Sequence, residues 1–194
     1  MSKFEQQIFN GTVGGASSDA FNGFADDAVM HVGGAMNVDA EGDTASTGSS
    51  CYLIRSGEGD VQALWGQNGE LAIGELQVLE RAGSATGRFP AYYHSITGWT
   101  GLAQGSSYSV ARICNLTEQA GKGLTDALIY QALALFPAAR GPNMIACSRR
   151  SLRQLQASRT ATSATGAPAP FPTEVEGVPI ITTDSLLNTE TILT

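Results

Sequence analysis

Few residues of this chain have the types and spacing that catalysis or metal binding requires. The two histidines, His31 and His94, lie far apart, without the spacing of metal ligands or of a catalytic triad. Each is predicted to be a surface histidine or one that hydrogen-bonds within the fold. No Gly-x-Ser-x-Gly sequence is present, so the nucleophile elbow of the α/β-hydrolases is excluded.

Two glycine-rich segments resemble the beginnings of nucleotide-binding loops but depart from them at decisive positions. Gly57-Glu58-Gly59 starts like a dinucleotide fingerprint, yet Gln62 stands where the third glycine belongs and no helix is predicted to follow. Gly121-Lys122-Gly123 resembles the end of a phosphate-binding loop, but it lacks the following Ser or Thr, and Leu116 replaces the earlier glycine. We expect a turn at each place.

Thiols and carboxylates offer two further candidate sites, and both are weak. Cys147 immediately precedes Ser148 at a predicted helix start, where the helix dipole lowers a thiol pKa, but its apolar neighbours favour simple burial. The acidic groups Asp26-Asp27 and Asp39/Glu41/Asp43 could bind calcium, although the second lacks the pattern of a helix-loop-helix site. We therefore predict no catalytic residue, cofactor or metal. The alternative is a small cytosolic α/β enzyme that uses Cys147 or Ser148.

The remaining polar feature is a cluster of arginines in the second half of the chain, comprising Arg149, Arg150, Arg153 and Arg159. Residues 1–97 hold 12 acidic and 4 basic residues, a balance of -8, whereas residues 98–194 hold 6 acidic and 7 basic, a balance of +1. The cluster is predicted either to be a solvated helix face or to pair with the acidic half of a neighbouring copy. The overall acidic charge argues against duplex DNA as a specific partner.

Composition narrows the protein class further. The 194 residues are 42% hydrophobic and only 15% charged, with 23 glycines, so disorder driven by charge is excluded. No apolar stretch is long enough to span a membrane. Three widely spaced cysteines in apolar surroundings, Cys51, Cys114 and Cys147, indicate reduced, buried thiols in a cytosolic protein. A surface this poor in charge suits a protein that packs against copies of itself.

The hydrophobic patterns predict which elements carry these residues. In the first half we expect a helix over 3–9 that ends at Asn10-Gly11, a short amphipathic helix from Ser18 to Met30, and an irregular segment over 33–50. Antiparallel strands are predicted next: a hairpin of 51–55 with 61–65, a second hairpin of 75–81 with 89–99, and a strand over 107–116.

In the second half the hydrophobic period changes to that of a helix. A helix capped by Thr125 is predicted to end at Pro137, followed by a buried strand over 143–147. Ser148 is expected to cap a helix with Leu152 and Leu155 inward and Arg149, Arg150 and Arg153 outward. A second buried strand is predicted over 177–183. These elements form a βαβ-like unit beside a β meander, an α+β fold.

Several stretches, in order, resemble the C-terminal part of the major capsid proteins of tailed bacteriophages, of the short-tailed phage and prophage type. They include FEQQIFNGTVGGASSDAFNGF, CYLIRSGEGDVQALWGQNGEL, GWTGLAQGSSYSVARICNLT and the segment from LTDALIYQALALFPAARGPNMIACSRRSLRQLQ to VPIITTDSLLNTE. The last two are the most specific, because the helix, the arginine segment, the proline loop and this ending recur together in that family. The resemblance extends from about Phe4 to Leu193.

The resemblance implies a structural subunit with the tailed-phage capsid fold, which has antiparallel or mixed β sheets with flanking helices. Residues 1–50 would then be the end of the spine helix, a short helix and an irregular segment, 51–116 the β-rich peripheral and axial region, and 117–194 the axial α/β region. Family members begin well upstream, so the N-terminal arm and most of the spine helix are expected to be absent and the chain to be a truncated form.

The implied partners are copies of the chain in pentamers and hexamers, together with other virion proteins. Packaged DNA would be met only through non-specific proximity, and no membrane is involved. The implied location is the virion, with the host cytoplasm before assembly. Arg149, Arg150, Arg153 and Arg159 are the candidate lattice contacts. A shell protein of a bacterial nanocompartment, which shares the fold, is the further alternative.

Overall fold

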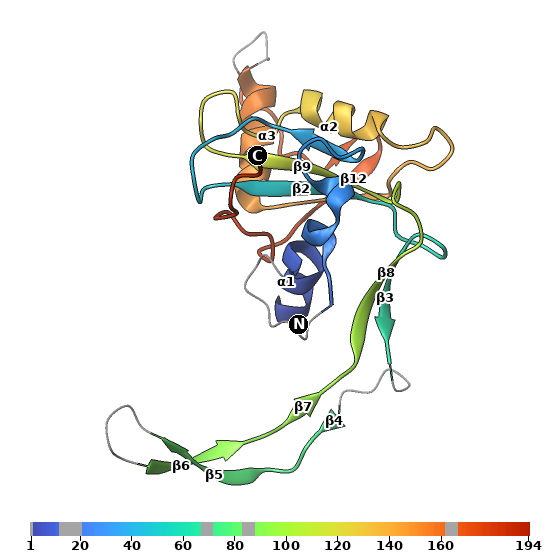
Figure 1. Cartoon of the computed structure of the whole chain (residues 1–194). Helices are drawn as coiled ribbons and strands as arrows, with labels where there is room; N and C mark the ends of the chain where they lie inside the picture. The colour runs from blue at the N-terminus through green and yellow to red at the C-terminus, as the bar shows by residue number, and fades with distance from the viewer. Residues whose placement is uncertain (1, 12–20, 67–71, 83–87, 162–166) are drawn as a thin grey trace. The chain divides into compact units, whose positions relative to one another are not determined.

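A computed structural model describes residues 2–11, 21–66, 72–82, 88–161 and 167–194 (Figure 1). The chain divides into two units, one made of residues 1–62 and 102–194 and the other of residues 63–101. Helices and one six-stranded sheet make up most of the first unit, whereas the described residues of the second form only short paired strands. The α+β class predicted from the sequence is confirmed.

The first unit is built on one mixed six-stranded sheet in the order β1-β9-β2-β10-β12-β11. Strand β2 runs antiparallel to both β9 and β10, while β1 is parallel to β9 and β12 is parallel to β10. Strands from all three sequence regions, 1–50, 51–116 and 117–194, therefore join the same sheet. The strand bounds are β1 Asn37–Asp39, β2 Ser49–Ile54, β9 Val110–Leu116, β10 Met144–Cys147, β11 Glu174–Val175 and β12 Val178–Thr182.

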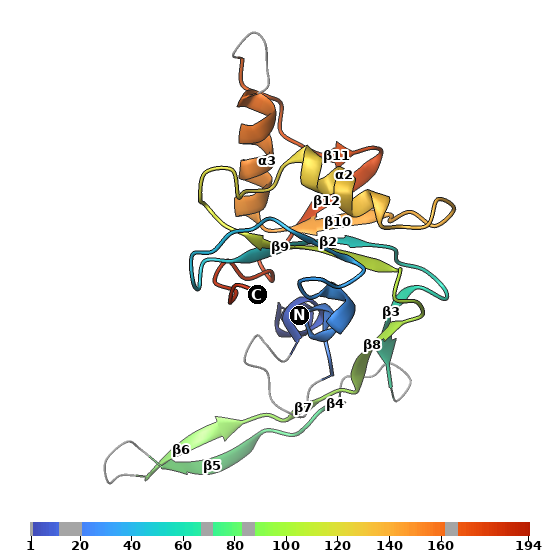
Figure 2. The same ribbon diagram turned by 45° about the horizontal axis from the view of Figure 1, so that its top comes forward.

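Both faces of this sheet are covered, and each covering forms a separate core (Figure 2). Helices α2 (Asp126–Ala134) and α3 (Arg149–Ala161) pack on one face. Helix α1 (Ser2–Asn10), the 3₁₀ turns η2 (Phe24–Asp26) and η3 (Ala28–Met30), and the tail after β12 pack on the other. Alternate residues of a strand point to opposite faces, so the central strands β2 and β9 are buried along their whole length.

Local capping explains why helices α2 and α3 begin where the sequence predicts. The Thr125 hydroxyl accepts a hydrogen bond from the Leu128 N–H at 3.4 Å, and the Ser148 hydroxyl accepts one from the Ser151 N–H at 3.2 Å. Leu152 and Leu155 are buried, as their spacing on α3 predicts. The β10–α3–β12 segment is thus the predicted βαβ unit, with parallel strands joined by a helix.

Helix α1 also ends as predicted. Gly11 follows Asn10 with a φ of 54°, the left-handed conformation that glycine adopts without strain. A Cβ at this position would lie 1.8 Å from Asp26 Oδ2, so the close approach of η2 also requires glycine.

The predicted hairpin of 51–55 with 61–65 is wrong. Strand β2 has β9 and β10 on its two sides, and β3 (Val61–Trp65) pairs with β8 (Thr100–Gln104) instead. The glycine turn between β2 and β3 carries the chain from one sheet to another, so the strands of 51–116 do not form a simple meander. Turn residues show where a strand ends, but they do not show which neighbour completes its hydrogen bonds.

Three further predictions need correction. Residues 21–30 form the two 3₁₀ turns rather than one amphipathic helix, because Asp26 and Asp27 bond to nearby backbone N–H groups; Ser18 lies outside the described residues. The segment 33–50 is not wholly irregular, since it contains β1 and the start of β2. Strand β12 exists, but it is half-buried to exposed rather than buried.

The second unit consists of residues 63–101, which we call the ribbon. Strand β4 (Ala72–Ile73) pairs with β7 (Ile96–Thr97), and β5 (Gln77–Ala82) pairs with β6 (Arg88–Tyr93), both antiparallel. The predicted hairpin of 75–81 with 89–99 is confirmed by this register. Within the described ranges of the chain, no helix is long and apolar enough to cross a membrane.

Candidate functional site

Two of the four candidate arginines lie on the exposed side of α3, as predicted. Arg149 donates to both carboxylate oxygens of Asp184, and Arg153 donates to the carboxylate of Glu118. All four side chains are more than half exposed, so these pairs stabilise the fold little. The Asp184 carboxylate holds the pKa of Arg149 above its ordinary value, and Arg149 in turn lowers the pKa of Asp184.

The other two arginines are held closer to the fold. Arg159 forms a bidentate ion pair with Asp126. Its Nε and Nη2 atoms lie 2.8 and 2.7 Å from the two carboxylate oxygens. Arg150 is half-buried and donates to the backbone carbonyls of Thr47 at 2.8 Å and Leu116 at 2.9 Å. Burial lowers the pKa of Arg150. The prediction that Arg150 faces outward is wrong, because the first turn of α3 lies over the end of β9.

Each arginine of the cluster therefore has a partner within its own chain. The paired carboxylates, Glu118, Asp126 and Asp184, all belong to the second half of the sequence rather than to the acidic first half. Internal pairing explains why arginines gather on α3 without any neighbouring copy. A lattice contact through this cluster stays a prediction.

The residues considered for catalysis have structural roles in the part of the chain that is described. Cys51, Cys114 and Cys147 are free and buried, as predicted, and burial raises the pKa of the Cys147 thiol to about 12. A thiol with so high a pKa is a poor nucleophile near neutral pH. His31 Nε2 donates to the Ala25 carbonyl at 3.0 Å.

The phosphate-loop and calcium candidates are likewise accounted for by local contacts. Lys122 Nζ lies 2.6 Å from the Glu41 carboxylate, so the lysine of the Gly-Lys-Gly turn is paired. Asp39 accepts from the Asn115 side chain at 2.9 Å and from the Glu41 N–H. Among the residues that the structure describes, no three His, Cys, Asp or Glu side chains group as metal ligands would.

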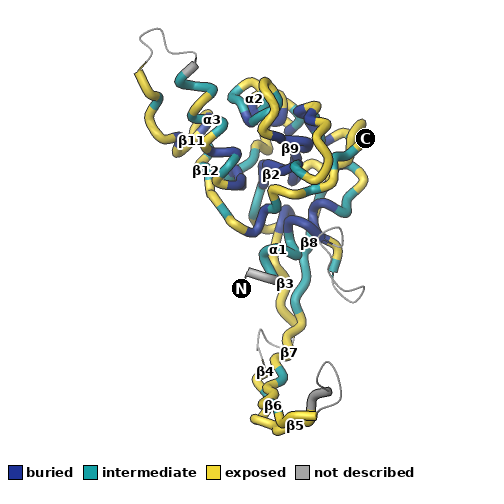
Figure 3. Tube along the Cα trace, turned by 90° about the vertical axis from the view of Figure 1, so that its left-hand side faces the viewer, coloured by how far each residue is buried: buried dark blue, intermediate teal, exposed yellow. Residues whose placement is uncertain are grey.

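The ribbon is where the structure departs most from an ordinary soluble surface (Figure 3). None of its described residues is buried. Eleven of the sixteen exposed large hydrophobic side chains of the described chain lie in it. They are Leu64, Trp65, Ile73, Leu76, Val78, Leu79, Phe89, Tyr92, Tyr93, Ile96 and Trp99. A concentration of exposed apolar side chains is typical of an interaction site.

Strand register shows that this apolar surface has two sides. Val78 lies opposite Tyr92 on one face of β5–β6, and their exposed fractions are 63% and 80%. Leu79, Phe89 and Tyr93 lie on the other face, because successive side chains alternate, and each of them is nearly half exposed. Large apolar side chains are therefore exposed on both faces of the ribbon, whereas a surface hairpin ordinarily gathers them on the face that packs against the core.

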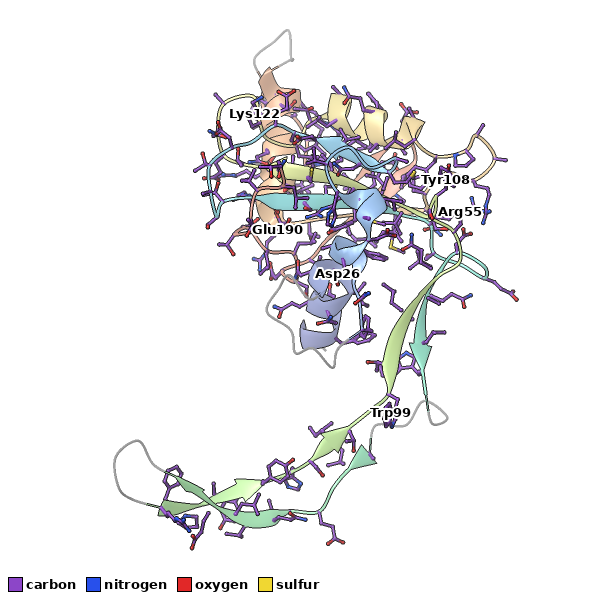
Figure 4. All side chains as sticks on the ribbon, viewed as in Figure 1. Asp26, Arg55, Trp99, Tyr108, Lys122 and Glu190 are labelled. Atoms are coloured by element: carbon purple, nitrogen blue, oxygen red, sulfur yellow. The ribbon has the colours of Figure 1, made fainter. Side chains whose placement is uncertain are left out.

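Few charges interrupt the ribbon. The sequence 63–101 contains only Glu70, Glu75, Glu80, Arg81 and Arg88 as charged residues, a balance of -1. Arg88 and Glu80 lie 3.4 Å apart and are both exposed. Trp99, labelled in Figure 4, accepts a backbone hydrogen bond from the Gly66 N–H at 2.7 Å and leaves its indole ring largely exposed. These features favour a protein partner over a charged ligand.

A buried carboxylate stabilises the first unit at the two places where the chain leaves for the ribbon and returns. Asp60 Oδ2 accepts from Arg55 Nε at 2.7 Å, and Oδ1 accepts from Ser109 Oγ at 2.8 Å and from Arg140 Nη2 at 2.7 Å. Hydrogen bonds from Arg55 and Ser109 lower the pKa of Asp60 below its ordinary value. Asp60 thus joins segments before and after the ribbon by three charge-assisted contacts.

We expect Asp60→Asn to reduce stability near neutral pH and to make stability less sensitive to acid. Because the pKa of Asp60 is lowered in the folded protein, its carboxylate contributes fully to folding stability above the ordinary Asp pKa of about 3.9. This contribution is lost as the pH falls through the lowered pKa of the folded protein. Urea midpoints measured from neutral to strongly acidic pH test this. Glu118→Gln, in an exposed ion pair, is the matched control. If the urea midpoints of wild type and Asp60→Asn changed equally with pH, the expectation would be contradicted.

A second buried polar cluster, which includes Glu190 (labelled in Figure 4), attaches the C-terminal tail to the sheet. Arg112 Nη2 lies 3.0 Å from Glu190 Oε2, and their side chains are only 4% and 11% exposed. Ser50 Oγ donates to the same carboxylate at 2.6 Å and accepts from Arg112 Nε at 2.9 Å. Asn115 adds a reciprocal pair of hydrogen bonds with the backbone of Leu193. The tail is therefore held by side chains of β2 and β9.

Sequence reasoning singled out neither the ribbon nor the Arg112–Glu190 pair, although each left a signal. For the ribbon the signal is the combination of aromatic residues at both odd and even positions of 89–93 with very few charges. For the ion pair it is a single arginine inside the otherwise uncharged strand 110–116. A charge inside a buried strand requires a partner, but the sequence does not identify it.

No protein-family model matches this sequence, and no curated protein matches it.

Proposed function

We propose that this chain is a structural subunit of a viral capsid of the tailed-phage type, which functions by contacts between copies and not by catalysis. The observation that carries the proposal is the ribbon, which exposes large apolar side chains on both of its faces. The sequence resemblance to major capsid proteins supports the same conclusion independently. The charge-poor composition fits a chain whose surface is largely interface.

The two faces of the ribbon favour a shell over a simple dimer. A two-stranded ribbon is marginally stable alone and gains stability only by packing against other elements. A partner that covers one face leaves Tyr92 and Val78, or Phe89 and Tyr93, in water. Copies arranged in closed rings and sheets of rings offer each ribbon more than one neighbour, so both faces are covered.

A nanocompartment shell is the alternative that shares this fold and also assembles from copies of one chain, so the ribbon alone does not separate it from a phage capsid. Neighbouring genes do: genes for a portal and a terminase indicate a phage, whereas genes for cargo enzymes indicate a compartment. A small enzyme is the less favoured alternative, because the described thiols are buried and the described histidines bond to backbone carbonyls.

We expect substitutions on either face of the ribbon to weaken self-association without unfolding the protein. One variant combines Val78→Ser with Tyr92→Ser, and a second combines Phe89→Ser with Tyr93→Ser. Removing one aromatic anchor from an interface costs about 2 kcal/mol, or roughly thirtyfold in the association constant. Sedimentation velocity and electron microscopy of wild type should show ring- or shell-sized particles, and each variant should shift toward monomer.

The control is Tyr130→Ser, an exposed aromatic of α2 outside the ribbon, which should assemble like wild type. At protein concentrations low enough for wild type to be monomeric, urea midpoints should stay unchanged in both ribbon variants, because none of the four side chains is buried within the chain. A wild-type chain that remains monomeric at all concentrations contradicts the proposal. Binding of wild type, but not of the ribbon variants, to lipid vesicles would also contradict it, because a membrane would then be the partner.

A further inference from the structure

Two of the three cysteines face each other across adjacent strands of the central sheet. The antiparallel register of β10 and β2 pairs Met144 with Ile54, Ile145 with Leu53, and Ala146 with Tyr52. One further step in this register places Cys147 opposite Cys51, and both residues lie within these strands.

Burial shows that the two thiols share a face. Cys51 and Cys147 are both fully buried and belong to the core beneath α2 and α3. The intervening pair, Tyr52 and Ala146, belongs to the core on the opposite face. Electrostatic repulsion from Cys147 contributes to the raised pKa of Cys51, as expected for thiols in contact range.

This geometry is close to that of a cross-strand disulfide. Directly opposite residues of an antiparallel pair have Cβ atoms about 4.5–5.5 Å apart, and a disulfide needs about 3.5–4.5 Å. An approach of about 1 Å is enough, and it lies along the hydrogen-bonding direction in which the strands are already adjacent. We propose that Cys51 and Cys147 are a latent disulfide site, which oxidation converts into a covalent link between β2 and β10. This inference does not depend on the proposed function.

The reaction with a small disulfide such as oxidised glutathione balances without any group from the protein beyond the two thiols. One cysteine thiolate attacks a glutathione sulfur and releases the first glutathione thiolate, leaving a mixed disulfide. The second cysteine thiolate then attacks the protein sulfur of that mixed disulfide and releases the second. Two cysteine protons are lost, two reduced glutathione molecules form, and the Sγ–Sγ bond is made.

Burial controls when this reaction takes place. Thiolates are the attacking species, and burial raises the pKa of both thiols, so the closed sheet reacts slowly. Oxidation therefore requires local opening of β2 from β10, or it precedes closure of the sheet during folding. The disulfide would close a loop from residue 51 to residue 147, and this loop contains the whole ribbon. It would therefore link β2, which precedes the ribbon in the sequence, to β10, which follows it.

Cys114 provides an internal control. It is buried on β9, next to β2, but its Sγ accepts from the Asn37 side chain at 3.2 Å, and it lies near Arg112 and Tyr52 on the opposite face. Burial is thus shared by all three cysteines, whereas an opposing cysteine is found only for Cys51 and Cys147.

The test exposes the full chain to oxidised glutathione in a urea concentration below the unfolding midpoint. Remaining thiols are then alkylated, and the peptides are mapped by mass spectrometry without reduction. We expect one dominant product, the Cys51–Cys147 peptide pair, and an upward shift of the urea midpoint that a reductant reverses. Cys114→Ala should keep both results, while Cys51→Ala and Cys147→Ala should each lose both.

Two outcomes would overturn the proposal. One is a mixture in which Cys51–Cys114 or Cys114–Cys147 peptides are as abundant as Cys51–Cys147. The other is complete alkylation of all three thiols after oxidation of wild type under conditions that transiently open the sheet. Should an alanine variant unfold, the peptide map of wild type and of Cys114→Ala alone decides between these outcomes.

Discussion

Glu190→Ala is expected to lower the free energy of unfolding by about 3–5 kcal/mol, because it leaves a charged guanidinium buried without its partner. The Arg112 side chain is only 4% exposed and has Glu190 as its carboxylate partner at 3.0 Å. Ser50, which bonds to both groups, loses its acceptor in the same variant. The C-terminal tail also loses one of its attachments to the sheet, so its protection from proteolysis should fall.

Urea unfolding monitored by circular dichroism measures this effect, and two further variants show its origin. Glu118→Ala removes a carboxylate from an exposed pair with Arg153 and should cost about 0–1 kcal/mol. The double variant Arg112→Met with Glu190→Leu removes both charges and should recover much of the loss. Equal destabilisation by Glu190→Ala and Glu118→Ala would show that the pair is not buried as described.

Tyr52→Ala is the second variant for which a large loss is expected, about 3–5 kcal/mol, as for other large aromatic residues removed from a core. The ring of Tyr52 lies 5.6 Å from that of Phe9 and 5.7 Å from that of Phe24. The Arg112 guanidinium lies over it at 5.7 Å from the ring centre. Tyr52 thus joins the sheet to α1 and to η2 on one face.

Tyr52→Phe separates packing from hydrogen bonding at the same site. The ring is kept, while the bond from Tyr52 Oη to the Phe9 carbonyl, at 3.2 Å, is lost, so the cost should be about 1 kcal/mol. Hydrogen exchange of α1 amides is the second measurement, and it should accelerate in Tyr52→Ala well beyond Tyr130→Ala, an exposed control. Unchanged exchange in α1 would mean that this helix does not depend on Tyr52 for its position.

The elements that the sequence predicted correctly share one property: their signals are local. Thr125 and Ser148 cap α2 and α3 through hydrogen bonds to backbone N–H groups three residues later. Gly11 ends α1 because of its own conformation. In each case the interacting groups are neighbours in the chain, so the residue types alone indicate the structure.

Two of the failed predictions concern partners distant in the sequence. Strand β2 was expected to pair with 61–65, but β9 and β10 occupy both of its edges. Arg150 was expected to face solvent, but the carbonyls of Thr47 and Leu116, far away in the chain, accept its hydrogen bonds. A hydrophobic period indicates which face of an element is apolar, and it does not indicate what covers that face.

The sequence by itself determined the α+β class, the βαβ unit, the two capped helices, the ribbon hairpin of β5 and β6, and the burial of the cysteines, because short-range capping, turn and hydrophobic patterns specify them. Only the tertiary structure decided that the ribbon buries none of its described apolar residues, that Arg112 pairs with Glu190, and that β10 is antiparallel to β2 in the register from which we infer the pairing of Cys147 with Cys51. Each of these depends on strand order and register across the sheet. Those are set by the packing of the whole chain, which no local pattern encodes.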